Sequence, residues 1–202
     1  LALIAGAVGL YYMYRCYRIP ARPFWNHWQT ATSFFGTALT LGSVLVGLIG
    51  VPTFILLGGN VTQIFSLALA CVVIGCGLEA FGLWRHAVAM DAANNEGSVS
   101  HYIQCTVFGK SYVLRNIVLL ANASVALLLL TLAPSVLTLA AASLVCLGAA
   151  VTAIIGRALF YVLVIPTTMP GAFFWKNKDF EEHARDIGLA NMPQVGVVAH
   201  GH

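Results

Sequence analysis

Residues 135–165 of this chain read SVLTLAAASLVCLGAAVTAIIGRALFYVLVI, an apolar run that contains a single charged side chain, that of Arg157. About 20 such residues are enough to cross the hydrocarbon core of a bilayer. In lipid the backbone has to satisfy its own hydrogen bonds, and a helix does so within one segment. The run therefore predicts a transmembrane helix, and with it an all-α membrane protein.

Three further segments have the same character, at residues 33–57, 61–84 and 116–133. The chain also begins inside an apolar run, residues 1–14, which is shorter than the roughly 20 residues that span a bilayer. We interpret this run as a truncated first span, whose earlier part is missing from the sequence. The composition agrees, because 8% of the residues are charged, whereas soluble domains are about a quarter charged. We expect a polytopic bundle with five spans.

The basic residues lie on alternate connections between these segments. They are Arg15, Arg18 and Arg22 in the first connection, Arg85, Lys110 and Arg115 in the third, and Arg157, Lys176, Lys178 and Arg185 near the end. The short turns near residues 58–60 and 133–134 carry none. Because basic residues concentrate on the cytoplasmic side, we expect a bacterial inner-membrane protein whose long connections face the cytoplasm. The chain then divides into a bundle, residues 1–165, and a cytoplasmic tail, residues 166–202, which lies along a partner or the membrane interface.

Several functions are disfavoured. The net charge of +3 is spread over three regions and does not indicate nucleic acid binding. The five cysteines form no CxxC pair and no Cys/His cluster, so we expect neither a metal nor an iron–sulfur cluster in this chain. No histidine falls in the middle of an expected span, which argues against haem held by two imidazoles. Catalytic motifs such as GxSxG and HExxH are missing, so we expect no catalytic residue here.

Two charged side chains lie inside apolar segments, close to the same membrane surface. Glu79 is about 18 residues into the segment at 61–84, and Arg157 about 22 residues into the last one, so both are near the inner edge of a core about 30 Å thick. They either pair or face a common cavity there. Arg157 can also snorkel to lipid phosphate, and Glu79 can be a structural carboxylate or part of a proton path. His86 follows at the interface, where it either meets a quinone headgroup or is a solvated loop histidine.

Three motifs resemble those of a known family. They are residues 14–26, YRCYRIPARPFWN, followed by Thr30 and the pair Phe34 and Phe35, then residues 109–115, GKSYVLR, and residues 156–161, GRALFY. Together they resemble the membrane-anchor subunit of the dimethyl sulfoxide (DMSO) reductase family over essentially the whole chain. The Arg-Pro-x-Trp loop and the long tail are most similar to the anchor of cytoplasmic sulfite dehydrogenase.

This resemblance implies an eight-helix anchor without haem, of which the chain would form the last five helices. Such an anchor fixes a molybdopterin catalytic subunit and an iron–sulfur subunit to the membrane and exchanges electrons with ubiquinone or menaquinone. The basic face is expected to receive the iron–sulfur subunit. Its cytoplasmic position favours sulfite oxidation, because DMSO reductase itself is exported. The implied function is a non-catalytic anchor that passes electrons from sulfite oxidation to the quinone pool.

Two sets of candidate residues follow. For the quinone site or its proton route we expect Arg157, Tyr161, Glu79 and His86. For docking of the iron–sulfur subunit we expect Arg18, Arg22, Trp25, Phe173, Phe174 and Trp175, although Pro-Trp loops can equally form an interfacial aromatic belt. The alternatives are a transporter or channel, which would need interrupted helices or charges near the midplane, and a purely structural anchor with quinone bound elsewhere.

Overall fold

The computed structural model describes residues 1–93, 95–163 and 186. That part of the chain is all-helical, with the elements α1 (Ala2–Tyr17), α2 (Gln29–Leu56), α3 (Val61–Ala92), α4 (Glu96–Thr106), α5 (Gly109–Leu129) and α6 (Val136–Val162). Four of these helices, α2, α3, α5 and α6, are long and apolar enough to cross a membrane. The predicted class, a transmembrane helix bundle, is confirmed. Phe173, Phe174, Trp175 and nearly all of the expected tail lie outside the described residues.

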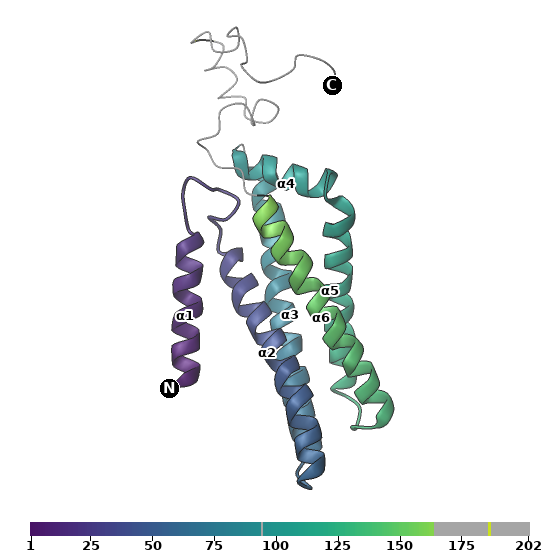
Figure 1. Cartoon of the computed structure of the whole chain (residues 1–202). Helices are drawn as coiled ribbons and strands as arrows, with labels where there is room; N and C mark the ends of the chain where they lie inside the picture. Colours follow the sequence, from purple (N-terminus) through teal and green to yellow (C-terminus); the bar gives the residue numbers. More distant parts are fainter. Residues whose placement is uncertain (94, 164–185, 187–202) are drawn as a thin grey trace.

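The four long helices form two hairpins, α2 with α3 and α5 with α6 (Figure 1). The first hairpin turns at Gly58, whose φ of 66° lies in the left-handed region that favours glycine. α3 contacts α5 and α2 contacts α6, so the two hairpins form one bundle. α4 lies across one end of the bundle, against α3 and α5. We call this end the α4 end, and the opposite end, where both turns lie, the hairpin end.

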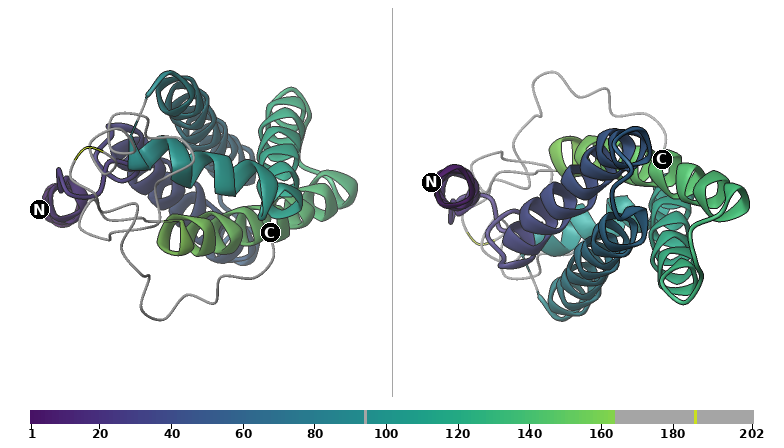
Figure 2. Two further views of the ribbon diagram at one scale, coloured as in Figure 1. Left: turned by 90° about the horizontal axis from the view of Figure 1, so that it is seen from above. Right: turned by 90° about the horizontal axis from the view of Figure 1, so that it is seen from below.

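α1 differs from the other long helices. Its 16 residues extend about 24 Å at a rise of 1.5 Å per residue, which is short of a span. Of the five expected spans, four are therefore confirmed. Both views of Figure 2 show α1 standing apart from the bundle. It packs against α2 and reaches α6 through Tyr17.

Residues 85–115 are largely helical, and the prediction of a loop there is wrong. α3 continues past Trp84 to Ala92, α4 follows, and α5 begins at Gly109. Hydropathy marks where a helix leaves apolar surroundings, and polar residues can continue the helix beyond that point. Asn95 caps the start of α4, because its side chain accepts a hydrogen bond from the backbone N–H of Gly97.

Glycines bring α2 and α3 together. A Cβ atom at Gly36 would meet the carbonyl oxygen of Gly75, and a Cβ atom at Gly75 would meet the carbonyl oxygen of Gly36. Both glycines are buried. Small residues at facing positions let membrane helices approach closely. The contact places α2 directly over the part of α3 that contains Glu79.

The two ends of the bundle have different cores. Towards the hairpin end the core is apolar and includes Val51, Phe65, Leu69, Leu129 and Val145. At the α4 end the core is largely aromatic and consists of Phe24, Trp25, Phe34, Met90, Leu159, Phe160 and Leu163. Buried polar side chains accompany this second core, and the described residues predicted for a quinone site all lie around it.

Candidate functional site

Trp25 holds the loop before α2 against α6. Its ring stacks on Phe160 at 5.1 Å between centroids, and its Nε1–H donates to the carbonyl oxygen of Phe160 at 2.8 Å. The side chain is buried. Docking of the iron–sulfur subunit by Trp25 stays a prediction, and its ring itself faces the bundle. The Pro-Trp motif looks like an exposed docking loop in sequence, but the loop folds back and inserts its indole into the bundle.

Arg18 and Arg22, the other described docking candidates, stay near the surface. The Arg18 side chain is exposed and donates from Nε to Oδ1 of Asn26 at 2.8 Å. The guanidinium of Arg22 lies 4.7 Å from the ring centroid of Trp25. Both arginines are thus held in place by the same loop, at the α4 end of the molecule.

A groove of about 550 Å³ opens between α1, α2 and α6 near the α4 end. Its walls are Leu10, Met13, Phe34, Thr37, Ala38, Leu41, Ala153, Ile154 and Arg157. Arg157 is the charged residue of this lining, and its guanidinium carbon lies 4.1 Å from the centroid of the Phe34 ring. Among the described residues Arg157 has no acidic partner within ion-pair distance. An apolar groove with one cation and one hydroxyl suits a ligand with an apolar body and a polar head.

Tyr161 lies beside this groove, on the last turn of α6. Its hydroxyl and that of Tyr17 are 2.8 Å apart, so the two phenols share a hydrogen bond that joins α6 to α1. Tyr17 also packs edge-on against Phe160 and Trp25. The phenol of Tyr161 is exposed and within reach of a surface ligand, whereas Tyr17 is half-buried.

Glu79 lies behind the groove, buried between α2, α3, α5 and α6. Its side chain is 5% exposed, and its Oε2 accepts a hydrogen bond from the hydroxyl of Thr37 at 3.4 Å. The expected pairing with Arg157 does not form an ion pair in the described residues. Arg115 of α5 faces this carboxylate across Gly156, where an added Cβ atom would lie 3.8 Å from Oε1 of Glu79 and 4.0 Å from Nη1 of Arg115. Because Thr37 also lines the groove, it connects the buried carboxylate to the ligand-accessible space.

Arg115 is the functional residue that the sequence reasoning missed. It was placed in a connection, yet it is 4% exposed inside α5. Its Nε and Nη2 donate to Oδ1 of Asn116 at 3.2 and 2.8 Å, and it lies 5.3 Å from the ring centroid of Tyr112. The one sequence feature that could have indicated its burial is its position directly before the apolar segment at residues 116–133. In a hydropathy profile, an arginine near the start of a membrane helix is taken as the end of the apolar segment, so the helix is predicted to begin after it.

His86 is also buried, and its interpretation as a solvated loop histidine is wrong. It is 4% exposed within α3, and its Nε2 lies 3.0 Å from the carbonyl oxygen of Phe24. A carbonyl oxygen accepts hydrogen bonds, so Nε2 carries the proton and Nδ1 of the neutral ring is an acceptor. The ring centroids of His27 and His101 lie 5.2 and 6.4 Å away. Three imidazoles from three different segments therefore form a row.

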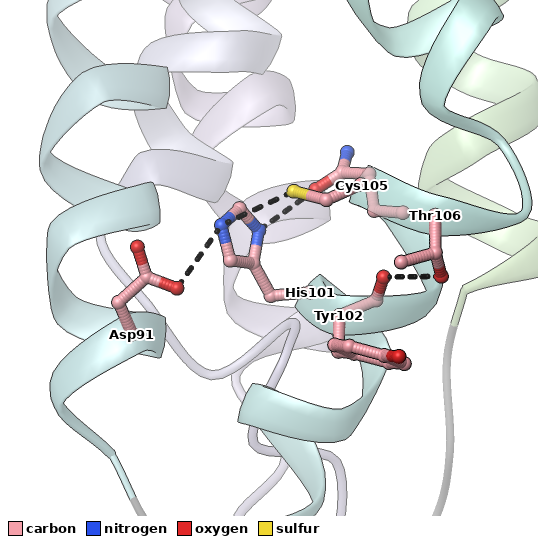
Figure 3. A network of polar contacts seen from close by, with 6 residues as sticks. Asp91, His101, Tyr102, Cys105 and Thr106 are labelled. Atoms are coloured by element: carbon pink, nitrogen blue, oxygen red, sulfur yellow. Dashed lines mark hydrogen bonds and ion pairs between the residues drawn. The ribbon is translucent and has the colours of Figure 1, made fainter.

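His101 connects this row to the molecular surface through α4 (Figure 3). Its Nε2 lies 3.7 Å from a carboxylate oxygen of Asp91, whose side chain is 72% exposed. Its Nδ1 lies 3.1 Å from Oε1 of the buried Gln104, and Sγ of Cys105 lies 3.7 Å from Nε2. His101 itself is buried. One ring thus joins an exposed carboxylate to a buried amide.

His27 lies two residues before α2, and its contact with the helix depends on its protonation state. Its Nδ1 accepts a hydrogen bond from the backbone N–H of Gln29 at 3.1 Å, at the first residue of the helix. Partial burial lowers the pKa of His27 from its usual 6.5, and the positive charges of Arg18 and Arg85 lower it further. The neutral ring is the form that this contact needs.

The family described as DMSO reductase anchor subunit (DmsC) matches the chain over residues 1–163, which include every helix described above. Neither the curated proteins nor the solved structures contain a significant match. Within the described residues, no three His, Cys, Asp or Glu side chains come together as a metal site.

Proposed function

This chain belongs to the DMSO reductase anchor subunit (DmsC) family, and from that premise we propose that it is the quinone-reactive subunit of its complex. The family provides the membrane anchor of DMSO reductase-type complexes, which contain molybdopterin and iron–sulfur subunits. In this proposal the anchor binds ubiquinone or menaquinone, and the iron–sulfur subunit exchanges electrons with the bound quinone. The anchor itself holds no haem and no iron–sulfur cluster.

The groove between α1, α2 and α6 is the observation that carries the proposal. A quinone has an apolar isoprenoid tail and two carbonyl oxygens that accept hydrogen bonds. The groove offers apolar walls to the tail, and Arg157 and Thr37 offer donors to the headgroup. Tyr161 lies next to it, and Glu79 lies one hydrogen bond behind it. The position of Arg157 in the groove wall, with Thr37 linking the groove to Glu79, supports the proposal.

A second groove, of about 450 Å³, lies between α2, α3 and α6 towards the hairpin end. Its lining includes Val51, Pro52, Phe65, Leu69 and Cys146, with no charged side chain and no aromatic residue apart from Phe65. Such a surface suits a lipid acyl chain. It offers a quinone headgroup the hydroxyls of Ser43 and Ser143 but no charged donor, so we assign the quinone to the groove that contains Arg157.

We further propose that the α4 end faces the cytoplasm and receives the iron–sulfur subunit. The described basic residues support this orientation, because they lie at that end, whereas the turns of the hairpin end carry none. Arg18 and Arg22 are then candidates for docking. A cytoplasmic catalytic subunit favours sulfite as the electron donor, with electrons passing from sulfite to quinone.

The alternative of a transporter or channel receives no support from the bundle. Transporters of known types bind substrate where discontinuous helices meet near the midplane. Here α2, α3, α5 and α6 each run as one helix from end to end. The buried charged residues gather at the α4 end.

Arg157→Ala tests the quinone site. We expect a rise of about tenfold in the KM for quinone, because one hydrogen bond from a charged donor is lost, and partial recovery in Arg157→Lys. The assay uses the purified complex with a soluble quinone, normalised by the rate with a dye that takes electrons from the partner subunits. Lys110→Ala, which removes an exposed cation at the same end, is the matched control. An unchanged KM in Arg157→Ala would remove this residue from the site.

The donor and the partners are tested on the same preparation. The complex purified through this chain should contain molybdenum and iron, and sulfite should reduce the bound quinone. Reduction of DMSO by quinol in place of sulfite oxidation would contradict the substrate proposal and leave the anchor function intact. A preparation with neither metal would contradict the anchor function.

A further inference from the structure

A row of polar side chains runs from the groove to the surface of the α4 end. Its first step is the hydrogen bond at 3.4 Å from Thr37, in the groove wall, to Oε2 of Glu79. A hydroxyl both donates and accepts, so Thr37 can pass a proton between a ligand in the groove and the carboxylate behind it. Glu79 is the first buried group behind the groove whose side chain can bind and release a proton.

The second step crosses the small space over Gly156 of α6, where Glu79 faces Arg115; the guanidinium stays protonated, so it positions a proton carrier there and transfers no proton itself. A Cβ atom placed on Gly156 would lie 3.8 Å from Oε1 of Glu79 and 4.0 Å from Nη1 of Arg115. The carboxylate and the guanidinium therefore face the same small space over this glycine. They form no direct ion pair within the described residues, so that space separates the two charges.

The third step is a cavity of about 20 Å³ on the other side of Arg115. It is lined by Gln29, Ser33, His86, Gln104, Arg115 and Gly156 among others. A cavity needs about 10–15 Å³ of such volume and two to four polar partners to hold one water molecule. This cavity meets both requirements. A water molecule there would contact the side chain of Arg115 as well as the buried imidazole of His86.

The last step reaches the surface. Gln104, at the cavity wall, lies 3.1 Å from Nδ1 of His101, and the rings of His86 and His101 are 6.4 Å apart. Nε2 of His101 then lies 3.7 Å from the exposed carboxylate of Asp91 (Figure 3). An imidazole can bind a proton on one ring nitrogen and release one from the other, which suits it to a relay between solvent and a buried site.

We propose that this row, from Asp91 through His101, His86 and the cavity to Glu79 and Thr37, conducts protons between the surface of the α4 end and a quinone in the groove. The proposal rests on the quinone site proposed above. Reduction of one quinone to quinol takes two electrons, which the iron–sulfur subunit supplies, and two protons, which the row delivers to the two carbonyl oxygens. Quinol oxidation returns both electrons and both protons by the reverse steps.

The charged and titratable groups around Glu79 come from every helix packed against it. They are Cys76 on α3, Arg115 on α5 and Arg157 on α6, while α2 contributes the hydroxyl of Thr37. Two cations near one buried carboxylate stabilise its charged form, and burial stabilises its neutral form. Both influences act on the same carboxylate, which can bind a proton from the row and release it during turnover.

Glu79→Gln is the central test. Glutamine keeps the shape and the contact with Thr37 but holds no transferable proton. We expect quinone reduction by the purified complex to fall about a hundredfold, as for loss of a general acid, and its solvent deuterium isotope effect to change. Dye reduction by the partner subunits normalises the amount of assembled complex. Gly77→Ala on the same helix adds a methyl group where nothing lies within 4 Å, and is the matched control.

Gly156→Ala covers the case in which Glu79→Gln fails to assemble. The added methyl group sits at ordinary contact distances, so it leaves the fold intact and fills the space between Glu79 and Arg115. We expect a severalfold loss of quinone reduction. At the surface end, His101→Gln should slow the reaction most at alkaline pH, where protons are scarce, and added imidazole should restore part of the rate. A purely structural role would show neither the pH dependence nor the rescue.

Full quinone reduction by Glu79→Gln and Gly156→Ala, with unchanged isotope effect, would overturn the proton path while leaving the quinone site standing. A wild-type complex that binds no quinone would overturn both proposals. The two failures are therefore distinguishable by measuring quinone binding and turnover on the same samples.

Discussion

The α4 end and the hairpin end of this bundle bury different kinds of side chain. The α4 end buries Glu79, His86, His101 and Arg115, and each has a hydrogen bond, ring contact or electrostatic partner. The hairpin end buries apolar residues such as Phe65 and Val145. Charged groups are costly at membrane depth and persist where they are paired or used. The hairpin end is thus explained by packing, whereas the buried charged groups of the α4 end fit the quinone site and the proton path proposed above.

The largest effect that would break this comparison is expected at Arg115. Arg115→Met removes the buried guanidinium that faces the same small space as the carboxylate of Glu79, and a buried charge that loses this compensation costs several kcal/mol. We expect poor assembly, measured as loss of complex from the membrane fraction and a lower melting temperature. Lys110→Met, on the exposed surface of the same helix, should behave like wild type. Normal stability of Arg115→Met would mean that the burial of Glu79 does not depend on the charge of Arg115.

Trp25 should give the next largest effect. Trp25→Ala removes the ring that stacks on Phe160, and the loss of a large buried aromatic side chain costs about 3–5 kcal/mol at most sites. Trp25→Phe retains the stacking but not the Nε1–H donor, and should cost about 1 kcal/mol. Thermal unfolding of the purified complex measures both. Equal losses in the two variants would show that the hydrogen bond, and not the stacking, holds the loop.

Asn122 tests the comparison with a buried polar residue that we expect to play no part in quinone chemistry. It is buried in α5 against Gly148, and its Nδ2 has no hydrogen-bond partner within the described residues. Replacing an unsatisfied buried amide by an apolar group of similar volume removes a desolvation penalty of about 1–3 kcal/mol. Asn122→Leu should therefore raise the melting temperature of the complex and leave quinone reduction unchanged. A fall in the melting temperature would indicate a polar contact that the bundle makes in its assembled state.

The smallest expected effect is at His27. Its folded pKa is lowered below the usual 6.5, so the unfolded state binds the proton more tightly. The contribution of His27 to the free energy of unfolding is fully present at pH values above its unfolded pKa. It decreases as the pH falls from the unfolded pKa towards the lower pKa of the folded state. The melting temperature of the wild type should drop in this acidic range, and that of His27→Gln should drop less. Parallel curves for the two proteins would exclude His27 as the source.

The sequence predicted the parts of this molecule that depend on hydropathy. The start of α3 at Val61 and the burial of Glu79 follow from the apolar segments, and the family follows from the motifs around Arg22, Arg115 and Arg157. The same reasoning failed where polar residues lie inside helices. His86 and Arg115 resemble loop residues in a hydropathy profile, and the helix packing that buries them is not visible in it.

Other expectations concern residues outside the described part of the chain, or ligands and partner subunits. The docking residues Phe173, Phe174 and Trp175 lie outside the described residues, and sulfite, quinone and the cytoplasmic orientation stay proposals. Trp25 shows why a motif is an incomplete guide to a surface. A tryptophan after Arg-Pro reads as exposed, yet its ring found a better partner in Phe160.

The most direct test of the account is photolabelling of the wild-type complex in membranes with a quinone that carries a photoactivatable azide. Labelled peptides are then identified by mass spectrometry. If quinone binds in the groove at the α4 end, we expect label at residues such as Met13, Ala153 and Ile154. Excess unlabelled quinone should remove this label by competition. Competed label at the hairpin end, around Phe65 and Cys146, would contradict the assignment of quinone chemistry to the α4 end.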